Sequence, residues 1–521
     1  MPRLMLPAAL VLAAPAAWAD FPLTILHTND FHDRFEPING SDSTCDAETA
    51  AAGECFGGSA RLVTAVAAAR ERAANSILVD GGDQFQGSLF YQRYKGAMTA
   101  EFMNLLGYDA MTVGNHEFDD GPEALREFVD AVEFPVLMSN ADISGEPLLA
   151  GAIQPSTVIE VGGERVGLIG ATPEDTDELA SPGPNVTFSA PEGAVQAEVD
   201  RLTADGVDKI VLVSHSGFEA DRRIAAAVTG LDVIVGGHTN TLLSNAQEGA
   251  VDAYPVMVGD TAIVQAYAYG KFLGELNVTF DDEGRVTEAM GEPLLMDAGV
   301  AEDGAALDRI AVLAEPLEAI RQEVVAEATA PIEGNRDVCR AMECSMGNLV
   351  AEAMLARVAD QGVTVALANS GGLRASIDAG EVTKGEVLTV LPFQNTLSTF
   401  ETTGQGIVDA LENGASQIEE GAGRFLQVAG LSYTVDPALP AGSRVSDVMV
   451  VKDGAATPID LAATYLAVTN NYVRNGGDGF GMFVDAEKAY DFGPDLADVT
   501  ADYLAANAPY EPFTDGRITV K

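Results

Sequence analysis

Five short apolar runs in the first half of the chain each end in a cluster of polar and glycine residues. Segments with helical periodicity separate several of these runs, so we expect strands and helices to alternate. This alternation predicts an α/β domain in which helices cover layered β-sheets. The expected strands cover residues 23–28, 76–80, 110–113, 209–213 and 231–235. Because ligands bind outside the carboxyl ends of the strands in such sheets, we expect the polar clusters to meet at one site.

The histidines are concentrated at these strand ends. All five lie before residue 240, and His32, His116, His215 and His238 each follow one of the expected strands. Histidines scattered through a core would not share that position, so we interpret these four as parts of a functional site. His27 differs because it lies inside the first apolar run. We interpret it as a core residue or as one that supports the site.

Length and charge narrow the possible functions. A chain of 521 residues is too long for one ordinary hydrophobic core, so two or more domains are expected. The formal net charge of −50 argues against nucleic-acid binding through a general basic surface. We interpret this charge as a strongly solvated acidic surface. An anionic substrate would need local cations to overcome the surrounding field.

Residues 1–19 have the pattern of a secretory signal peptide. Arg3 precedes an apolar stretch at residues 4–15, and residues 17–19 form an Ala-Trp-Ala cleavage sequence. The apolar stretch is too short to span a bilayer, and the C-terminus lacks the hydrophobic tail of a lipid anchor. We therefore expect a periplasmic or secreted protein without a membrane anchor.

The four cysteines are expected to form disulfides, because export places them in an oxidising environment. Three pairings are formally possible, but short loops close most readily, which favours Cys45–Cys55 and Cys339–Cys344. A thiolate metal site is the alternative. Neither pair of cysteines has a Cys-x-x-Cys spacing, which disfavours that alternative.

The sequence pattern changes after residue 303. Apolar residues then recur at steps of three and four over residues 310–324, which predicts one helix with a kink at Pro316. We place the domain boundary here, with a layered domain over 20–303, a linker helix over 304–325 and a smaller α+β domain over 326–521. The smaller domain is expected to contain helices at 349–358 and 407–411 and a strand at 363–367.

The polar clusters contain seven candidate metal ligands that offer only oxygen or imidazole donors. They are Asp30, His32, Asp83, Asn115, His215, His238 and Asn240. Such donors suit hard or borderline ions such as Mn²⁺, Mg²⁺, Co²⁺ or Zn²⁺. Seven donors fit two ions that share a bridging carboxylate. Two ions about 3.5–4 Å apart can generate hydroxide at neutral pH and stabilise an in-line displacement at phosphorus.

One imidazole remains for chemistry beside these donors. His116 follows Asn115 directly, and Asp119, three residues later, can orient it and stabilise its protonated form. The alternative interpretation is that each cluster is only a glycine-rich turn with polar caps. That explanation suffices for one cluster, but five clusters with complementary donors favour a metal site.

The motifs resemble the signature of the calcineurin-type metallophosphoesterases. The matching sequences are Asp30-Phe31-His32, Gly82-Asp83, Gly114-Asn115-His116-Glu117, His215 and Gly237-His238. With Cys339-Arg340, residues 369–374 and Asn475-Gly476-Gly477-Asp478 added, the mature chain as a whole resembles the secreted 5'-nucleotidases. The resemblance implies that one ion is bound by Asp30, His32, Asp83 and Asn240. It implies Asp83, Asn115, His215 and His238 for the second ion, and His116 with Asp119 as a catalytic dyad.

The second half of the chain carries groups suited to a nucleotide. Arg340 and Arg374 can bind oxyanions or sugar oxygens, and Asp478 can accept hydrogen bonds from ribose hydroxyls. Phe393 and Tyr472 can stack on the two faces of a base. By resemblance, the pocket also includes Asn369 and Asn395.

The expected activity is hydrolysis of nucleoside 5'-monophosphates to nucleosides and phosphate. The nearest alternatives are 2',3'-cyclic-nucleotide phosphodiesterase with 3'-nucleotidase action, and nucleotide-sugar hydrolysis. The Cys339-Arg340 element and residues 369–374 favour 5'-nucleotidase. A secreted nucleotide-binding protein without activity is disfavoured because no metal or dyad position is lost. The resemblance also implies that the two domains close around the substrate by rotation about the linker helix.

Overall fold

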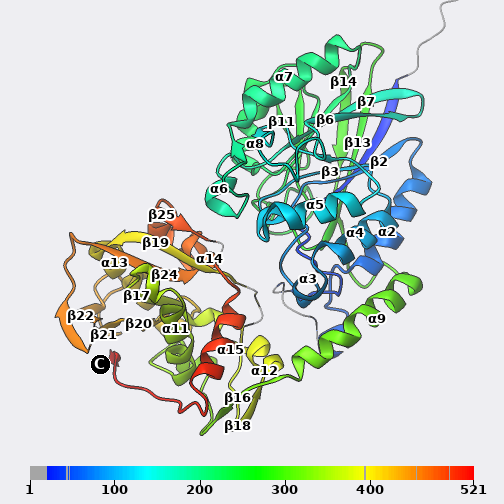
Figure 1. Ribbon diagram of the computed structural model, residues 1–521. Helices are drawn as coiled ribbons and strands as arrows, with labels where there is room; N and C mark the ends of the chain where they lie inside the picture. The colour runs from blue at the N-terminus through cyan, green and yellow to red at the C-terminus, as the bar shows by residue number, and fades with distance from the viewer. Residues whose placement is uncertain are drawn as a thin grey trace, which may run out of the picture.

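The computed structural model describes residues 20–521, apart from residues 41, 43, 44, 46, 392, 394, 453 and 492. The expected signal peptide at residues 1–19 lies outside the described residues. The chain forms an N-terminal unit over residues 21–295 and a C-terminal unit over residues 324–520. Helix α9 (Gly304–Arg321) connects them (Figure 1).

Two β-sheets form the centre of the N-terminal unit. The first has the order β14 (Val286–Gly291), β13 (Phe272–Phe280), β1 (Phe21–Thr28), β2 (Ser76–Asp80), β3 (Ala110–Thr112) and β4 (Val136–Leu137), with β15 (Leu294–Leu295) paired to β13. The second has the order β11 (Val256–Val258), β12 (Thr261–Val264), β10 (Val233–Val235), β9 (Ile210–Ser214), β7 (Glu164–Ala171) and β6 (Ser156–Val161). Strands β1 to β4 are parallel, and so are β7, β9, β10 and β12. A small sheet pairs β5 (Ala141–Asp142) with β8 (Thr187–Phe188).

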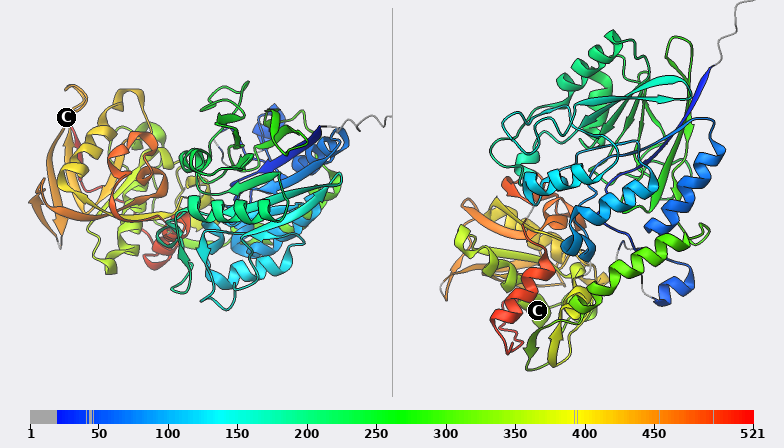
Figure 2. Two further views of the ribbon diagram at one scale, coloured as in Figure 1. Left: turned by 90° about the horizontal axis from the view of Figure 1, so that it is seen from above. Right: turned by 45° about the vertical axis from the view of Figure 1, so that its right-hand side comes forward.

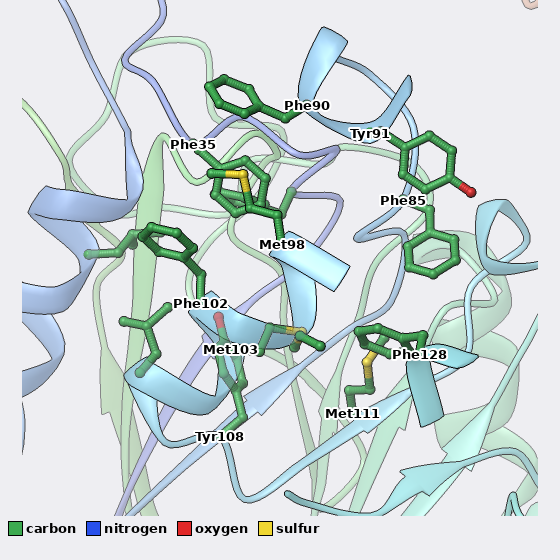
Figure 3. Packing of buried hydrophobic residues seen from close by; sticks show 14 of the residues in the cluster. Phe35, Phe85, Phe90, Tyr91, Met98, Phe102, Met103, Tyr108, Met111 and Phe128 are labelled. Carbon is green, nitrogen blue, oxygen red and sulfur yellow. The ribbon is translucent and has the colours of Figure 1, made fainter. Parts of the chain in front are cut away.

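Both faces of the first sheet are buried. Ile25 and Ile77 belong to the core that the two sheets share, whereas the adjacent residues Leu26 and Leu78 pack against helices on the opposite face. A sheet covered on both faces needs continuous apolar strands, which is why these runs show no polar alternation. Figure 3 shows the helix-side core, where Met111 of the sheet lies among aromatic and methionine side chains.

The N-terminal unit also contains helices. They are α1 (Ala47–Ala52), α2 (Ser59–Arg72), α3 (Leu89–Tyr94), α4 (Gly96–Leu106), α5 (Gly121–Ala131), α6 (Thr176–Leu179), α7 (Pro191–Ala204) and α8 (Phe218–Ala227). Helices α2, α4 and α5 contribute to the helix-side core, and α7 and α8 pack on strands of the second sheet and join the core cluster of that sheet. The helical periodicity between the expected strands therefore corresponds to helices that bury their apolar sides.

The C-terminal unit is built around a mixed sheet with the order β20 (Leu426–Ala429), β17 (Val365–Asn369), β24 (Thr464–Asn470), β19 (Leu397–Thr403) and β25 (Glu487–Tyr490). A second sheet has the order β23 (Ala455–Pro458), β22 (Val445–Lys452), β21 (Leu431–Val435) and β26 (Ile518–Val520), and β16 (Val324–Ala328) pairs with β18 (Gly380–Thr383). The helices are α10 (Arg336–Cys339), α11 (Ser345–Arg357), α12 (Lys384–Val390), α13 (Gly404–Ala415), α14 (Asn471–Arg474) and α15 (Leu496–Ala506). Helices α11 and α15 share one apolar core, and α13 belongs to another.

The connecting helix α9 is shorter than the sequence pattern predicts. It continues through Pro316 and ends at Arg321, and Val324 begins strand β16 by pairing with Thr383. Val324 is half exposed, so its assignment to the apolar helix stripe was wrong. The residues after Arg321 include two adjacent β-branched valines, which favour a strand when a partner strand is at hand.

The N-terminal part of the α9 stripe packs on the N-terminal unit. Ile310, Leu313 and Leu317 are buried in the helix-side core. Figure 2 shows α9 lying along the helices of the N-terminal unit in a view from a second direction. The same helix contacts α12 of the C-terminal unit. Helix α9 is therefore anchored in one unit and touches the other.

His27 is a core residue. Its Nε2 atom lies 2.8 Å from the hydroxyl of Tyr254, and both side chains are buried. Burial lowers the pKa of His27 to about 3. The folded protein therefore keeps this imidazole neutral down to strongly acidic pH.

The buried imidazole makes stability depend on pH. Below pH 6.5 the unfolded chain protonates His27 but the folded protein does not, so stability falls as the pH decreases towards 3. Between pH 7 and pH 5 the wild-type protein should lose about 2 kcal/mol more unfolding free energy than the His27→Gln variant. Urea denaturation of the N-terminal unit at both pH values measures this difference. Parallel pH dependence of the two proteins would contradict it.

Candidate metal centre

Strand ends from both sheets of the N-terminal unit bring the polar clusters together. His32 follows β1, Asp83 follows β2 and His116 follows β3, and ligand atoms of these three residues lie within 4.8 Å of one another. Asp83 forms a second such group with His215, after β9, and His238, after β10. Asp83 is the member that the two groups share.

Asp83 remains ionised at the centre of the site. Its Oδ2 atom lies 2.9 Å from Nε2 of His215 and 3.9 Å from Nε2 of His116. Its Oδ1 atom accepts a hydrogen bond from the backbone N–H of His116 at 2.9 Å. Burial alone would raise the pKa of Asp83, but the charges of His215 and His116 outweigh burial and lower it. An ionised carboxylate with two usable oxygens suits a bridging ligand.

Asp30 connects the two sheets at the site. Both of its carboxylate oxygens accept the backbone N–H of His238, at 3.1 and 2.9 Å. Asn29 donates to Oδ2 of Asp30 at 2.8 Å, and its own Oδ1 accepts from the N–H of Ala266 at 3.0 Å. Asp30 Oδ1 lies 4.0 Å from Nε2 of His215. Asp30 is thus held beside the second ligand group although it follows the first sheet.

The histidines have the environment of metal ligands. Nδ1 of His215 lies 2.6 Å from the carbonyl of Gly81, and Nδ1 of His32 lies 3.0 Å from the carbonyl of Phe85. A carbonyl at Nδ1 fixes the tautomer that carries its lone pair at Nε2, the arrangement found in most histidine ligands. Burial, aided by the charge of a neighbouring histidine, lowers the pKa of His32 to about 3 and that of His238 to about 4. Neutral imidazoles are the form that binds metals. Burial alone would lower the pKa of His215, but the carboxylates of Asp83 and Asp30 raise it to about 10, so this ring must lose a proton when it binds an ion.

Two asparagines supply unsatisfied oxygen atoms. The Oδ1 atoms of Asn115 and Asn240 are both buried and have no hydrogen-bond partner. Leaving a buried acceptor unsatisfied costs about 1–3 kcal/mol, so such atoms indicate a missing partner. Amide oxygens are donors for hard divalent ions. All seven expected ligands therefore fit divalent metal ions in chemistry, and three of them, His32, His215 and His238, are shown to approach Asp83 or Asp30.

His116 and Asp119 form the expected pair. Nδ1 of His116 lies 2.7 Å from Oδ2 of Asp119. The 3₁₀ turn η1 (His116–Phe118) explains this contact, because side chains three residues apart align in such a turn. Burial alone would lower the pKa of His116, but the carboxylates of Asp119 and Asp83 raise it to about 9. The His116 side chain is 18% exposed against 3% for Asp83, so His116 faces the open side of the site.

The expected nucleotide-binding residues form two groups in the C-terminal unit. Nδ2 of Asn369 donates to Asp478 at 3.0 Å, and the hydroxyl of Tyr472 contacts the same carboxylate at 3.1 Å. The guanidinium of Arg374 lies 5.3 Å from the centre of the Phe393 ring. Phe393 and Asn395 line a small cleft together with Gly372, Leu391 and Leu496. Arg340 donates to the carbonyl of Gly421 at 3.1 Å.

Comparison with known proteins agrees with this two-part arrangement. Residues 23–241 match the calcineurin-like phosphoesterase family, and residues 324–485 match the 5'-nucleotidase C-terminal domain. The 5'-nucleotidase of Diplobatis ommata is 38% identical, with 96% of this chain and 90% of the relative covered. The chain belongs to the 5'-nucleotidase family.

Other family members show the same coverage. The snake venom 5'-nucleotidase of Naja atra is 36% identical over 96% of this chain and 98% of its own length. The crystal structure of a 5'-nucleotidase precursor from Thermus thermophilus is 42% identical and superposes with a TM-score of 0.66, covering 96% of this chain and 99% of the other. The fold and the pairing of the two units are thus those of the family.

Both disulfides expected in this family member are present. Cys45 bonds to Cys55, and Cys339 bonds to Cys344. Gln427 donates to the carbonyls of Cys339 and Met342, at 2.8 and 2.7 Å, and so fixes the loop that carries Arg340.

Within the described ranges, no helix is both long enough and apolar enough to cross a bilayer.

One residue of the site received no role from the sequence. Glu117 is fully buried and accepts hydrogen bonds from the backbone N–H groups of Asp83 and Gln84. The one signal in the sequence is a carboxylate between His116 and the apolar Phe118 in a polar turn. That signal indicates a buried acceptor but does not identify its donors.

The shared position of Asp83 predicts the effect of its removal. Asp83→Ala should weaken Mn²⁺ binding at both ligand groups by more than about tenfold. A tenfold loss is the lower limit typical of residues that only orient a ligand, and a ligand itself should matter more. Asp232→Asn is the control, since Asp232 is a half-buried carboxylate that accepts the N–H of Ile210 away from the site. Metal content after Mn²⁺ loading and desalting, measured by mass spectrometry, distinguishes the variants. Unchanged content in Asp83→Ala would contradict a bridging role.

Proposed function

We propose that the chain hydrolyses nucleoside 5'-monophosphates to nucleosides and phosphate with two divalent ions. The observation that carries this proposal is the position of Asp83 in both ligand groups, with His116 on their open side. Membership of the 5'-nucleotidase family supports the choice of a nucleoside monophosphate as substrate. The phosphate would occupy the side of the site that His116 faces.

The proposed ligand sets divide the seven donors between the two ions. One set is Asp30, His32, Asp83 and Asn240, and the other is Asp83, Asn115, His215 and His238. The donor chemistry is compatible with Zn²⁺, Mn²⁺, Co²⁺ or Mg²⁺. When bound, two such ions supply Lewis acidity at phosphoryl oxygens and lower the pKa of water.

His116 is the proposed catalytic residue of the chain itself. Because Nδ1 donates to Asp119 and the pKa of His116 is raised to about 9, the ring carries a second proton at Nε2 at neutral pH. We assign this Nε2–H to the phosphoryl group, where it stabilises the negative charge that develops as the ester bond breaks. Asp119 keeps the ring in that orientation and stabilises its positive charge.

The C-terminal unit is proposed to bind the nucleoside. Asp478 and Asn369 present a carboxylate and an amide to ribose hydroxyls, and Arg374 keeps a cation beside the aromatic face of Phe393. The remaining proposed contacts are Arg340, Asn395 and Tyr472. Because the metal ligands and these residues lie on different units, a bound nucleotide would contact both. We propose that the two units close on it about α9.

We also propose that the protein is exported to the periplasm or secreted. The expected signal peptide at residues 1–19 and the two disulfides support this location. The names of the snake venom relative and of the bacterial precursor agree with export.

The proposed activity is tested by phosphate release from a substrate panel. AMP with Mn²⁺ should release phosphate, and a chelator should abolish release. The panel includes 2',3'-cyclic AMP, ADP and UDP-glucose, and AMP should give the highest kcat/KM. Faster turnover of the cyclic nucleotide or the nucleotide sugar would replace the proposed function by one of those activities.

Loss of the His116 ring should affect turnover and not metal binding. His116→Ala is expected to lower kcat for AMP by about 10²- to 10⁴-fold, the usual contribution of a positioned acid or base. Its Mn²⁺ content should match the wild-type protein. His27→Gln, which alters a buried histidine in the core, is the control and should keep wild-type kcat. Full activity of His116→Ala would exclude the assigned role.

Phe393 should matter only for substrates with a base. Phe393→Ala is expected to raise KM for AMP by about 5- to 150-fold, since stacking on one aromatic ring contributes about 1–3 kcal/mol. KM for 4-nitrophenyl phosphate should change much less. Phe513→Ala is a matched control, because the guanidinium of Arg517 covers the Phe513 ring at 5.5 Å outside the expected pocket. Equal KM changes for both substrates would argue against stacking.

A further inference from the structure

We call the polar segments that directly follow β2 and β3 the two junctions. Their backbones lie close together at Gly82 and Gly114. A Cβ atom added to Gly82 would lie 2.8 Å from the nitrogen of Gly114, and one added to Gly114 would lie 2.2 Å from Oδ1 of Asp83. Only glycine fits at these two positions. The close approach brings Asp83 from one junction next to Asn115 from the other.

The carboxylate of Glu117 joins these two junctions. Its Oε2 atom accepts the backbone N–H of Gly114 at 2.6 Å and of Asp83 at 3.0 Å. Its Oε1 atom accepts the N–H of Gln84 at 2.8 Å and of Phe85 at 3.2 Å. Glu117 is fully buried, and four donors occupy the acceptor sites that a carboxylate offers. It therefore has no lone pair left for a metal ion.

We infer that Glu117 is a positioning residue that sets the separation of Asp83 and Asn115 and thereby the affinity of the metal centre. The inference takes these two residues as metal ligands and rests on the proposed function only to that extent. Glu117 acts through the backbone, since it holds the N–H groups of Asp83 and of the residue before Asn115. All four bonds join protein atoms, so the arrangement forms without a metal ion and prepares the ligands for it.

The geometry explains why a carboxylate is needed at this position. A glutamine side chain has one acceptor oxygen, and its NH₂ group would face two backbone N–H donors in place of the second oxygen. Glu117→Gln therefore releases one pair of bonds, either those to Asp83 and Gly114 or those to Gln84 and Phe85. Either loss weakens the link between the junction after β2 and the junction after β3, while side-chain volume stays nearly constant.

The test compares metal affinity with metal-independent stability. Calorimetric titration of the metal-stripped full chain with Mn²⁺ should show affinity about 10- to 100-fold weaker in Glu117→Gln, the range typical of partners that orient metal ligands. The rise in melting temperature on adding Mn²⁺ should also be smaller than in the wild-type protein. A purely structural role would lower the melting temperature equally with and without Mn²⁺ and leave the affinity unchanged.

Asp109→Asn is the matched control. Asp109 accepts the backbone N–H of Leu78 at 2.8 Å and so joins the start of β3 to the middle of β2, away from the metal ligands. This variant should lower stability without changing Mn²⁺ affinity. Wild-type affinity in Glu117→Gln, or an equal loss of affinity in Asp109→Asn, would overturn the inference. Because the readout is metal binding, it stays interpretable even if AMP proves not to be a substrate.

Two further measurements test the inference if the Glu117→Gln variant does not fold. Glu117→Asp keeps the charge but shortens the side chain by one methylene, and it should also weaken Mn²⁺ binding. In the metal-stripped wild-type protein, the amides of Asp83, Gln84, Phe85 and Gly114 should exchange slowly with deuterium. Rapid exchange at these amides would overturn the inference, because it would show that the junctions are not held before the metal binds.

Discussion

The candidate metal centre depends on backbone conformations that residues with side chains seldom adopt. Five of the seven proposed ligands have left-handed φ values between 49° and 72°: Asp30, His32, Asp83, His238 and Asn240. Aspartate, asparagine and histidine tolerate this region better than other residues, yet each instance still costs about 1–3 kcal/mol. The strained residues directly follow strands whose two faces are buried. The rigid strands and the core around them therefore maintain a geometry that the loops alone would not keep.

The site lies at the seam between the two sheets of the N-terminal unit. The backbone N–H of His238, after the second sheet, binds the Asp30 carboxylate, after the first. The Nδ1 atom of His215 contacts the carbonyl of Gly81 across the same seam. Each proposed ligand set draws residues from both sheets. Packing that fixes one sheet on the other therefore also fixes the distances between ligands, and the core between the sheets contributes to metal binding.

The sequence predicted much of this arrangement because the relevant signals are local. Strand β2 coincides with the expected residues 76–80, since a strand covered on both faces must be continuously apolar and must end where polar residues begin. Oxygen and imidazole donors at five strand ends then indicate a metal site. The sequence also predicted the contact of His116 with Asp119, because residues three apart meet within one turn. The ligand roles themselves stay predictions.

Other features could not be predicted, because they depend on which segments meet in space. Val324 continues a helical pattern in sequence, but strand β18 offers it a partner, and the strand forms. The left-handed φ of Asp83 leaves no trace in hydrophobic periodicity, which reports burial and not backbone angles. Glu117 is one acidic residue among 79 in this chain, and only the fold shows that four backbone N–H groups converge on it. Its environment distinguishes it from the others, because a buried carboxylate is kept only where donors surround it.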